Sequence, residues 1–140
     1  RHPKRKSLAD RTPMDPHHFR FVGYNCHLFD GIIGPVPKFN EAARRDSIGE
    51  RLDGGRFDIV GLCEVWSDAN KAVFIRRCQR SLPHSFTDSL AGRMGSGLLL
   101  LSRYPLLEPR FTPFATLAGM DSMTQKGVMQ AVVAAPSGMR

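Results

Sequence analysis

Two polar residues stand where apolar strands are expected to end. Glu64 lies near the end of the apolar run from Phe57 to Val65, and Asn25 lies near the end of a shorter run that begins at Phe19. A carboxylate placed in apolar surroundings is costly unless a cation, a basic neighbour or water compensates its charge. Because successive strands of a βαβ unit end side by side, where α/β proteins bind ligands, we expect Asn25 and Glu64 to converge. The alternatives are a turn role for Asn25 and exposure in water for Glu64.

Oxygen donors favour a hard cation at this pair. A carboxylate and an amide suit Mg²⁺, with Mn²⁺ as the alternative, better than zinc. The three cysteines, Cys26, Cys63 and Cys78, form no C-x-x-C pair, which argues against a zinc knuckle. We expect them to be small core residues.

Strand and helix patterns alternate in the first half of the chain. Strands are expected at residues 19–29 and 57–65, and helices at residues 41–52, capped by Asn40, and 68–82, capped by Ser67 or Asp68. Residues 95–114 and 126–135 read as further strands joined by turns, so the pattern predicts an α/β fold with a mixed or antiparallel second half. The expected buried helix positions are Ala42, Ala43, Ile48, Leu52, Ala72, Val73, Ile75, Cys78 and Leu82.

Much of the net positive charge of the chain lies in its first 20 residues. Residues 1–20 hold six Lys or Arg against two Asp, which is +4 of the net +7 and leaves +3 for the other 120 residues. We interpret residues 1–18 as a basic, disordered leader and residues 19–140 as the N-terminal part of a domain truncated at its C-terminus. A linker without function is one reading of the leader, and attraction to phosphate or anionic lipid is the other. No apolar run reaches the roughly 20 residues that cross a bilayer.

Four motifs in order carry a family resemblance. The stretches YNCHLF, DIVGLCEVW, GSGLLLLSRYPL and DSMTQKGV resemble the successive N-terminal motifs of the endonuclease/exonuclease/phosphatase superfamily. The E-V-W ending and the G-S-G-L opening are most similar to its neutral sphingomyelinase and phospholipase C-like branch. The resemblance implies a four-layer α/β/β/α sandwich of mixed sheets, of which this chain would form the N-terminal portion.

The resemblance also implies a Mg²⁺-dependent hydrolase of phosphate esters. Glu64 would be a metal ligand, and Asn25 would help to hold the metal or phosphate. Ser102, at the end of GSGLLLLS, would support the site, and Lys126 would either reach phosphate or be an exposed lysine at a strand start. The family's later Asp-x-Asn and Asp-His motifs do not occur in this sequence, and none of its five histidines is expected to replace the histidine base.

Several functions remain open from the sequence. We expect a phosphodiesterase that acts on a phospholipid such as sphingomyelin, with peripheral membrane contact, and we expect the fragment by itself to be inactive. A nuclease or phosphatase of the same superfamily, with nucleic acid as a partner, is the first alternative. A binding module that keeps the fold without catalysis is the second.

Overall fold

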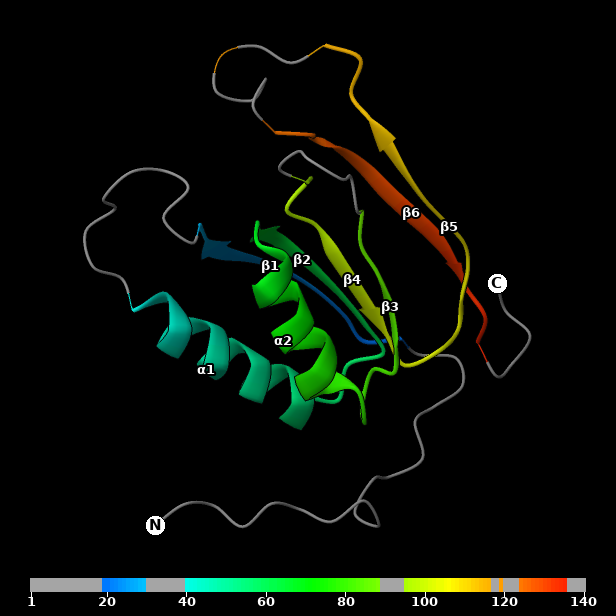
Figure 1. Cartoon of the computed structure of the whole chain (residues 1–140). Coiled ribbons are helices and arrows are strands. Elements are labelled where there is room, and N and C mark those ends of the chain that lie inside the picture. The colour runs from blue at the N-terminus through cyan, green and yellow to red at the C-terminus, as the bar shows by residue number, and fades with distance from the viewer. Residues whose placement is uncertain (1–18, 30–39, 89–94, 117–118, 120–123, 136–140) are drawn as a thin grey trace.

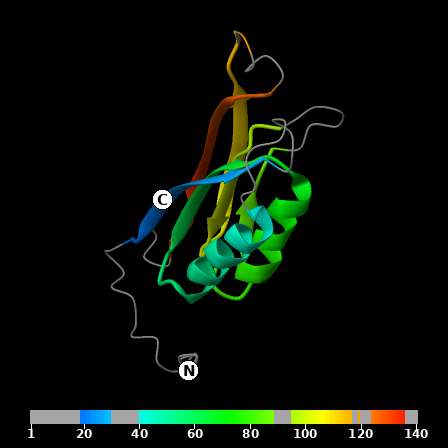
Figure 2. The same ribbon diagram turned by 90° about the vertical axis from the view of Figure 1, so that its left-hand side faces the viewer.

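The computed structural model describes residues 19–29, 40–88, 95–116, 119 and 124–135. They form a four-stranded sheet of order β1-β2-β4-β3, a two-stranded sheet of β5 and β6, and two helices. Both helices lie on one face of the larger sheet, and the smaller sheet lies on the β3 side, away from them (Figures 1 and 2). The expected α/β class is confirmed. The elements are β1 (Phe21–Leu28), α1 (Glu41–Gly54), β2 (Ile59–Val65), α2 (Asp68–Cys78), β3 (His84–Phe86), β4 (Leu99–Ser102), β5 (Leu106–Pro113) and β6 (Gly127–Val133).

Side-chain caps fix where the helices begin. The Asn40 Oδ1 accepts the N–H of Ala43 at 3.0 Å, and the Ser67 Oγ accepts the N–H of Asn70 at 3.1 Å. Each bond satisfies a backbone donor that the first helical turn leaves without a partner. Both expected caps are therefore confirmed, although α2 ends at Cys78, before the expected Leu82.

The strands pair as the element order predicts. β1 and β2 are parallel neighbours joined through α1, whereas β4 is antiparallel to both β2 and β3, and β5 is antiparallel to β6. The mixed second half is confirmed, and β3 is an additional short strand that the sequence patterns did not indicate. No helix among the described residues is long and apolar enough to cross a membrane.

The core lies between the four-stranded sheet and the helices. Phe74 is fully buried there beside Val60, Leu62 and Leu101. Two expectations about α1 are wrong, because Ala42 and Ala43 are exposed and the helix instead buries Gly49 and Leu52. On α2, Ala72 is exposed, and the buried residues are Asn70, Lys71, Phe74 and Cys78. The two helices approach each other closely at Gly49, where an added Cβ would lie 2.7 Å from the Arg77 side chain.

Candidate metal centre

Asn25 and Glu64 lie at adjacent positions on neighbouring strands. In the parallel pair of β1 and β2, Asn25 is the register partner of Cys63, and Glu64 is the next residue. Neighbouring strands are about 4.8 Å apart, so the two residues lie near each other at one end of this strand pair. The structure thus places the two residues that the sequence analysis singled out at the same end of this strand pair.

A β-bulge places a third residue between them. The register of β1 against β2 shifts between Asn25 and Leu28, and His27 lies within this shift. The N–H of His27 donates to the Asn25 Oδ1 at 2.9 Å, and its Nδ1 lies 3.3 Å from the Glu64 Oε2. His27 therefore contacts both predicted site residues. The sequence analysis missed this, and the only available signal was a histidine two positions after Asn25.

The backbone of the site is left-handed at two positions. His27 has φ of 51° and Glu64 has φ of 55°, and among the described non-glycine residues only Glu108 shares this conformation. Such residues are uncommon and occur often at functional sites. Glu64 leaves the regular path of β2 here, with 30% of its side chain exposed. Its carboxylate is therefore reachable from solvent, although Val60 and Leu62 in the same strand are buried.

The turn before β4 supports the strand end that carries Glu64. The N–H of Val65 donates to the Gly97 carbonyl at 2.9 Å, and a Cβ on Gly97 would lie 3.1 Å from the Trp66 ring. Gly97 has φ of 72°, which suits glycine. The neighbouring Ser96 is held by the buried Asp88, which accepts both the Ser96 N–H and its hydroxyl. This turn is therefore held in place by structural hydrogen bonds.

Ser102 and Lys126 lie at opposite ends of the molecule. Ser102 pairs with Ile59, five residues before Glu64, so it lies about 16 Å along the strand from the site. It is fully buried, and its Oγ accepts the N–H of Tyr104. Lys126 precedes β6, which begins at the same end of the molecule as the ends of β1 and β2 (Figure 1). The structure therefore keeps Lys126 on the side of Glu64 and separates Ser102 from it.

The donor set suits a cation that retains water. The candidate ligands are the carboxylate of Glu64 and the Oδ1 of Asn25. An amide oxygen has two lone pairs, so the Asn25 Oδ1 can bind a cation while it accepts the hydrogen bond from His27. Within the described ranges, no group of three or more His, Cys, Asp and Glu side chains could hold a metal ion. Mg²⁺ commonly binds through one or two carboxylates together with waters and substrate phosphate. The residues present fit Mg²⁺ or Mn²⁺ and do not fit a closed zinc site.

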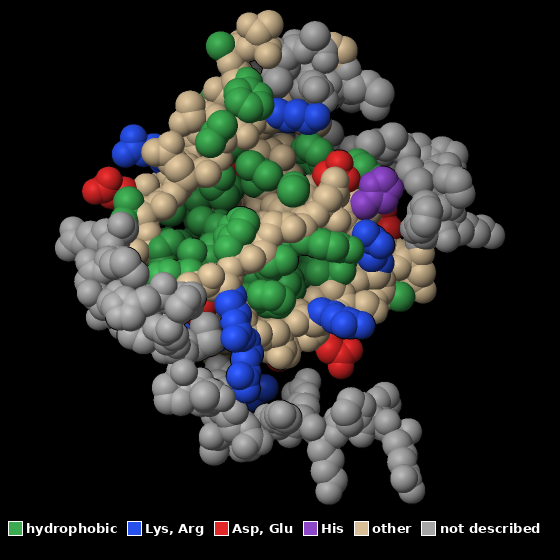
Figure 3. All heavy atoms as spheres, turned by 180° about the vertical axis from the view of Figure 1, so that it is seen from behind, with side chains coloured by type: hydrophobic (Ala, Val, Ile, Leu, Met, Phe, Trp, Pro, Cys, Tyr) green, Lys and Arg blue, Asp and Glu red, His purple; other side chains and the backbone are tan. Residues whose placement is uncertain are grey.

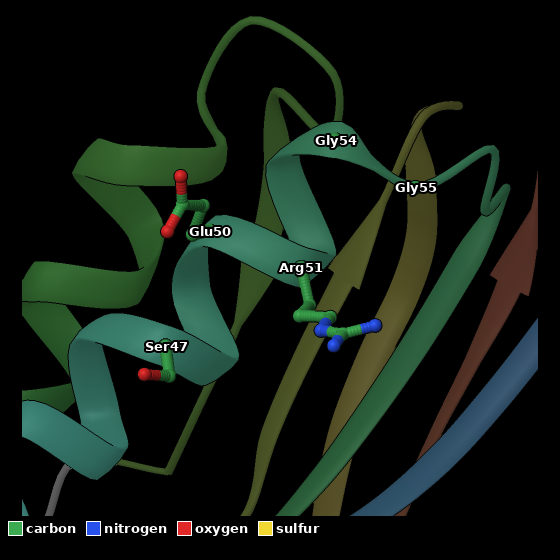
Figure 4. A pocket seen from close by; sticks show the side chains of 5 residues that line it. All are labelled: Ser47, Glu50, Arg51, Gly54 and Gly55. Carbon is green, nitrogen blue, oxygen red and sulfur yellow. The ribbon is translucent and has the colours of Figure 1, made fainter. Parts of the chain in front are cut away.

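An open pocket lies elsewhere on the surface. It has a volume of about 540 Å³ and is lined by Ser47, Glu50, Arg51, Gly54 and Gly55. The side chain of Arg51 points away from those of Ser47 and Glu50 (Figure 4). The pocket lies where α1 leads into β2, at the opposite end of β2 from Glu64. Its side chains do not converge, so it offers no competing site.

The cysteines are free thiols in the described structure. Burial raises the pKa of Cys26 to about 12, with a further contribution from Cys63, and burial with the nearby Asp53 raises the pKa of Cys78 to about 11. Burial and then the Glu64 carboxylate also raise the pKa of Cys63. Thiols with raised pKa values are poor nucleophiles, because the thiolate is the reactive form. Cys26 and Cys78 are buried in the core as expected, whereas the expectation is wrong for Cys63, which is only partly buried.

Comparison with known proteins gives the family context. The Endonuclease/Exonuclease/phosphatase family matches residues 22–133. A Drosophila melanogaster protein named "Putative neutral sphingomyelinase" is 38% identical over 77 residues, which are 55% of this chain and 17% of that protein.

Two solved structures show the same arrangement of strands and helices. Sphingomyelinase C from Streptomyces griseocarneus matches with a TM-score of 0.68 and 18% identity over 82% of this chain and 44% of that one. A beta toxin variant from Staphylococcus aureus with bound magnesium ions matches with a TM-score of 0.69 and 18% identity over 81% of this chain and 43% of that one. At such identities the likeness shows a shared fold. The chain spans less than half the length of these structures.

Proposed function

Because this chain belongs to the Endonuclease/Exonuclease/phosphatase family, we propose that it is part of a Mg²⁺-dependent phosphodiester hydrolase whose metal is held by Glu64 and Asn25. One observation carries the proposal. Asn25 and Glu64 lie at the ends of parallel strands β1 and β2, and His27 contacts both. The magnesium ions bound to the structurally similar beta toxin support the choice of cation, and Mn²⁺ is the alternative.

Different residues of this chain would bind the cation and the substrate phosphate. Glu64 supplies the negative charge, and Asn25 supplies a neutral oxygen whose direction is set by its bond to His27. Lys126, directly before β6, is the lysine that we propose to attract the phosphate of a substrate. When bound, the cation supplies a Lewis acid that polarises a phosphoryl oxygen. We assign no described residue as the base that activates water.

A phospholipid is the substrate that we favour. The Drosophila relative carries the name of a sphingomyelinase, and so does the similar structure from Streptomyces. Residues 21–140 carry a net charge of only +3, which is the +7 of the chain less the +4 of residues 1–20. Proteins that track a nucleic-acid backbone need a strongly basic groove. A nuclease or a phosphatase is therefore the second choice.

A larger fold would complete the domain. We propose that the four-stranded sheet and the β5–β6 sheet belong to a four-layer α/β/β/α sandwich. In such a sandwich the face of the sheet that carries no helix packs against a second sheet. The helix-free face of this molecule is apolar at its centre (Figure 3), as that packing requires.

The substitution Glu64→Gln in the full-length protein tests the metal assignment. It keeps the shape of the side chain and removes its charge, so we expect Mg²⁺-dependent hydrolysis of sphingomyelin to fall by more than about 100-fold, since even outer-shell partners of metal ligands cost about 10–100-fold. Circular dichroism should show an unchanged fold. Glu50→Gln, at an exposed carboxylate on α1, is the matched control and should retain activity.

The same preparation tests the substrate class. Hydrolysis of sphingomyelin or lysophospholipid vesicles should exceed cleavage of DNA or RNA at equal metal concentration. Strong nuclease activity without lipid hydrolysis would reverse this order. Full activity of the Glu64→Gln variant would remove Glu64 from the site.

A further inference from the structure

His27 is placed to control the geometry of the proposed metal ligands. Its ring Nδ1 lies 3.3 Å from the Glu64 Oε2, and its backbone N–H donates to the Asn25 Oδ1 at 2.9 Å. An ionised carboxylate can only accept hydrogen bonds, so the imidazole donates through Nδ1. One carboxylate oxygen of Glu64 is thereby hydrogen-bonded to His27, and the other carboxylate oxygen remains available to bind the cation.

The local backbone conformation sets the orientation of His27. The bulge between Asn25 and Leu28 inserts His27 into β1 with φ of 51°, and this left-handed turn directs its N–H back to the Asn25 side chain. Bulges next to active sites commonly re-aim a side chain in this way. The imidazole is also held from its other side, because the Phe29 ring packs against it edge to face with centroids 4.6 Å apart. The ring therefore has contacts with Phe29, which directly follows β1, and with Glu64 on β2.

We propose that His27 is a positioning residue that orients Glu64 and Asn25 for the divalent cation, without itself binding the metal. This inference rests on the proposed function and deepens it. Hydrogen-bond partners of ligating carboxylates typically contribute about 10–100-fold to metal affinity, because they hold the ligand in one orientation. A ligand pair left to rotate would lose this preorganisation and bind the cation more weakly.

Two substitutions separate the hydrogen bond from the backbone conformation. His27→Gly removes the ring and tolerates the positive φ, whereas His27→Asn tolerates it as well and keeps an N–H donor near the position of Nδ1. In the full-length protein without substrate, we expect the Kd for Mn²⁺, measured by electron paramagnetic resonance, to rise about 10–100-fold in His27→Gly. His27→Asn should restore most of the affinity.

Three controls distinguish this inference from the proposed function. His84→Gly removes the other described histidine, which pairs with Ser102 at the far end of the sheet, and should leave the Mn²⁺ affinity unchanged. Glu64→Gln should weaken Mn²⁺ binding, and His27→Gly added to Glu64→Gln should cause no further loss. If Glu64→Gln binds Mn²⁺ normally, the metal assignment itself fails.

The positioning role fails under different outcomes. It is overturned if Glu64→Gln weakens Mn²⁺ binding while His27→Gly binds as tightly as the native protein. It is also overturned if His27→Asn binds as weakly as His27→Gly, since a donor at this position would then be irrelevant. If the glycine variant does not fold, the asparagine variant decides: near-native affinity supports the role, and a loss beyond about tenfold rejects it.

Discussion

At the scale of single residues, the candidate site combines backbone strain with the carboxylate of Glu64. Two of the three described non-glycine residues with positive φ are His27 and Glu64, and they contact each other. Left-handed residues of this kind cost about 1–3 kcal/mol and persist where surrounding contacts fix them. Here the fixing contacts are the bond from Val65 to Gly97 and the bond from His27 to Asn25. The third residue with positive φ, Glu108, lies on exposed β5.

The buried thiols lead to a prediction about alkaline stability. The pKa values of Cys26 and Cys78 rise from 9.0 to about 12 and about 11 on folding, so the folded state keeps protons that the unfolded state releases. Their contribution to stability is complete below pH 9 and is lost as the pH rises toward these folded values. We expect the free energy of unfolding, measured with denaturant, to fall between pH 9 and 11. A variant with both Cys26→Ala and Cys78→Ala should show a shallower fall, and an identical slope would contradict the assignment.

At the scale of elements, a buried ion pair joins α2 to Asp88 in the segment that follows β3. The Lys71 Nζ lies 3.8 Å from the Asp88 Oδ1, and each side chain is only 3% exposed. Asp88 in turn binds Ser96, which precedes the Gly97 that bonds to Val65. Lys71 was not expected in the core, because a lysine on a helix is usually exposed. This network connects α2 to the strand end that carries Glu64.

Removing one charge of this pair should destabilise the fold. Lys71→Met keeps the apolar stem and leaves the Asp88 carboxylate buried without its cation, so we expect a loss of about 3 kcal/mol in the free energy of unfolding. The double variant Lys71→Met with Asp88→Asn removes both charges and should recover more than half of this loss. A double-mutant cycle by denaturant unfolding measures the coupling. Independent, additive losses would show that the pair is not coupled.

At the scale of the whole molecule, one face of the strands has no helix over it. Figure 3 shows hydrophobic side chains gathered across the middle of this face. The ring of Phe21, which is 66% exposed, lies over Gly23 and Gly61, where added Cβ atoms would be 3.6 Å away. On β6, Val128 is 51% exposed. Monomeric proteins rarely leave a large apolar patch open, so this surface is suited to packing against further structure.

We therefore expect residues 1–140 alone to be incompetent as an enzyme. The open face should bind the dye ANS and promote aggregation, and the missing general base alone should cost about 10²–10⁴-fold in rate. The measurement is Mg²⁺-dependent phosphodiesterase activity of residues 1–140 beside the full-length protein. Comparable turnover by the two would mean that the site or the domain boundary is misplaced.

The sequence alone determined the local features of this protein. Both helix caps and the β1–β2 neighbours followed from residue spacing and element order, because capping and strand alternation depend on residues a few positions apart. The same reasoning placed Asn25 and Glu64 at one end of this strand pair. The motif order also indicated the family, which the match over residues 22–133 confirms.

Only the tertiary structure decided which side chains meet across the chain. The bulge that aims His27 at Glu64 depends on how β1 and β2 align, and their residues are 37 positions apart. The burial of Lys71 depends on Asp88, and the distance of Ser102 from the site depends on the antiparallel register of β4. Such contacts arise when whole elements pack together. The residue pattern of one segment therefore does not reveal which residues of a distant segment will contact it.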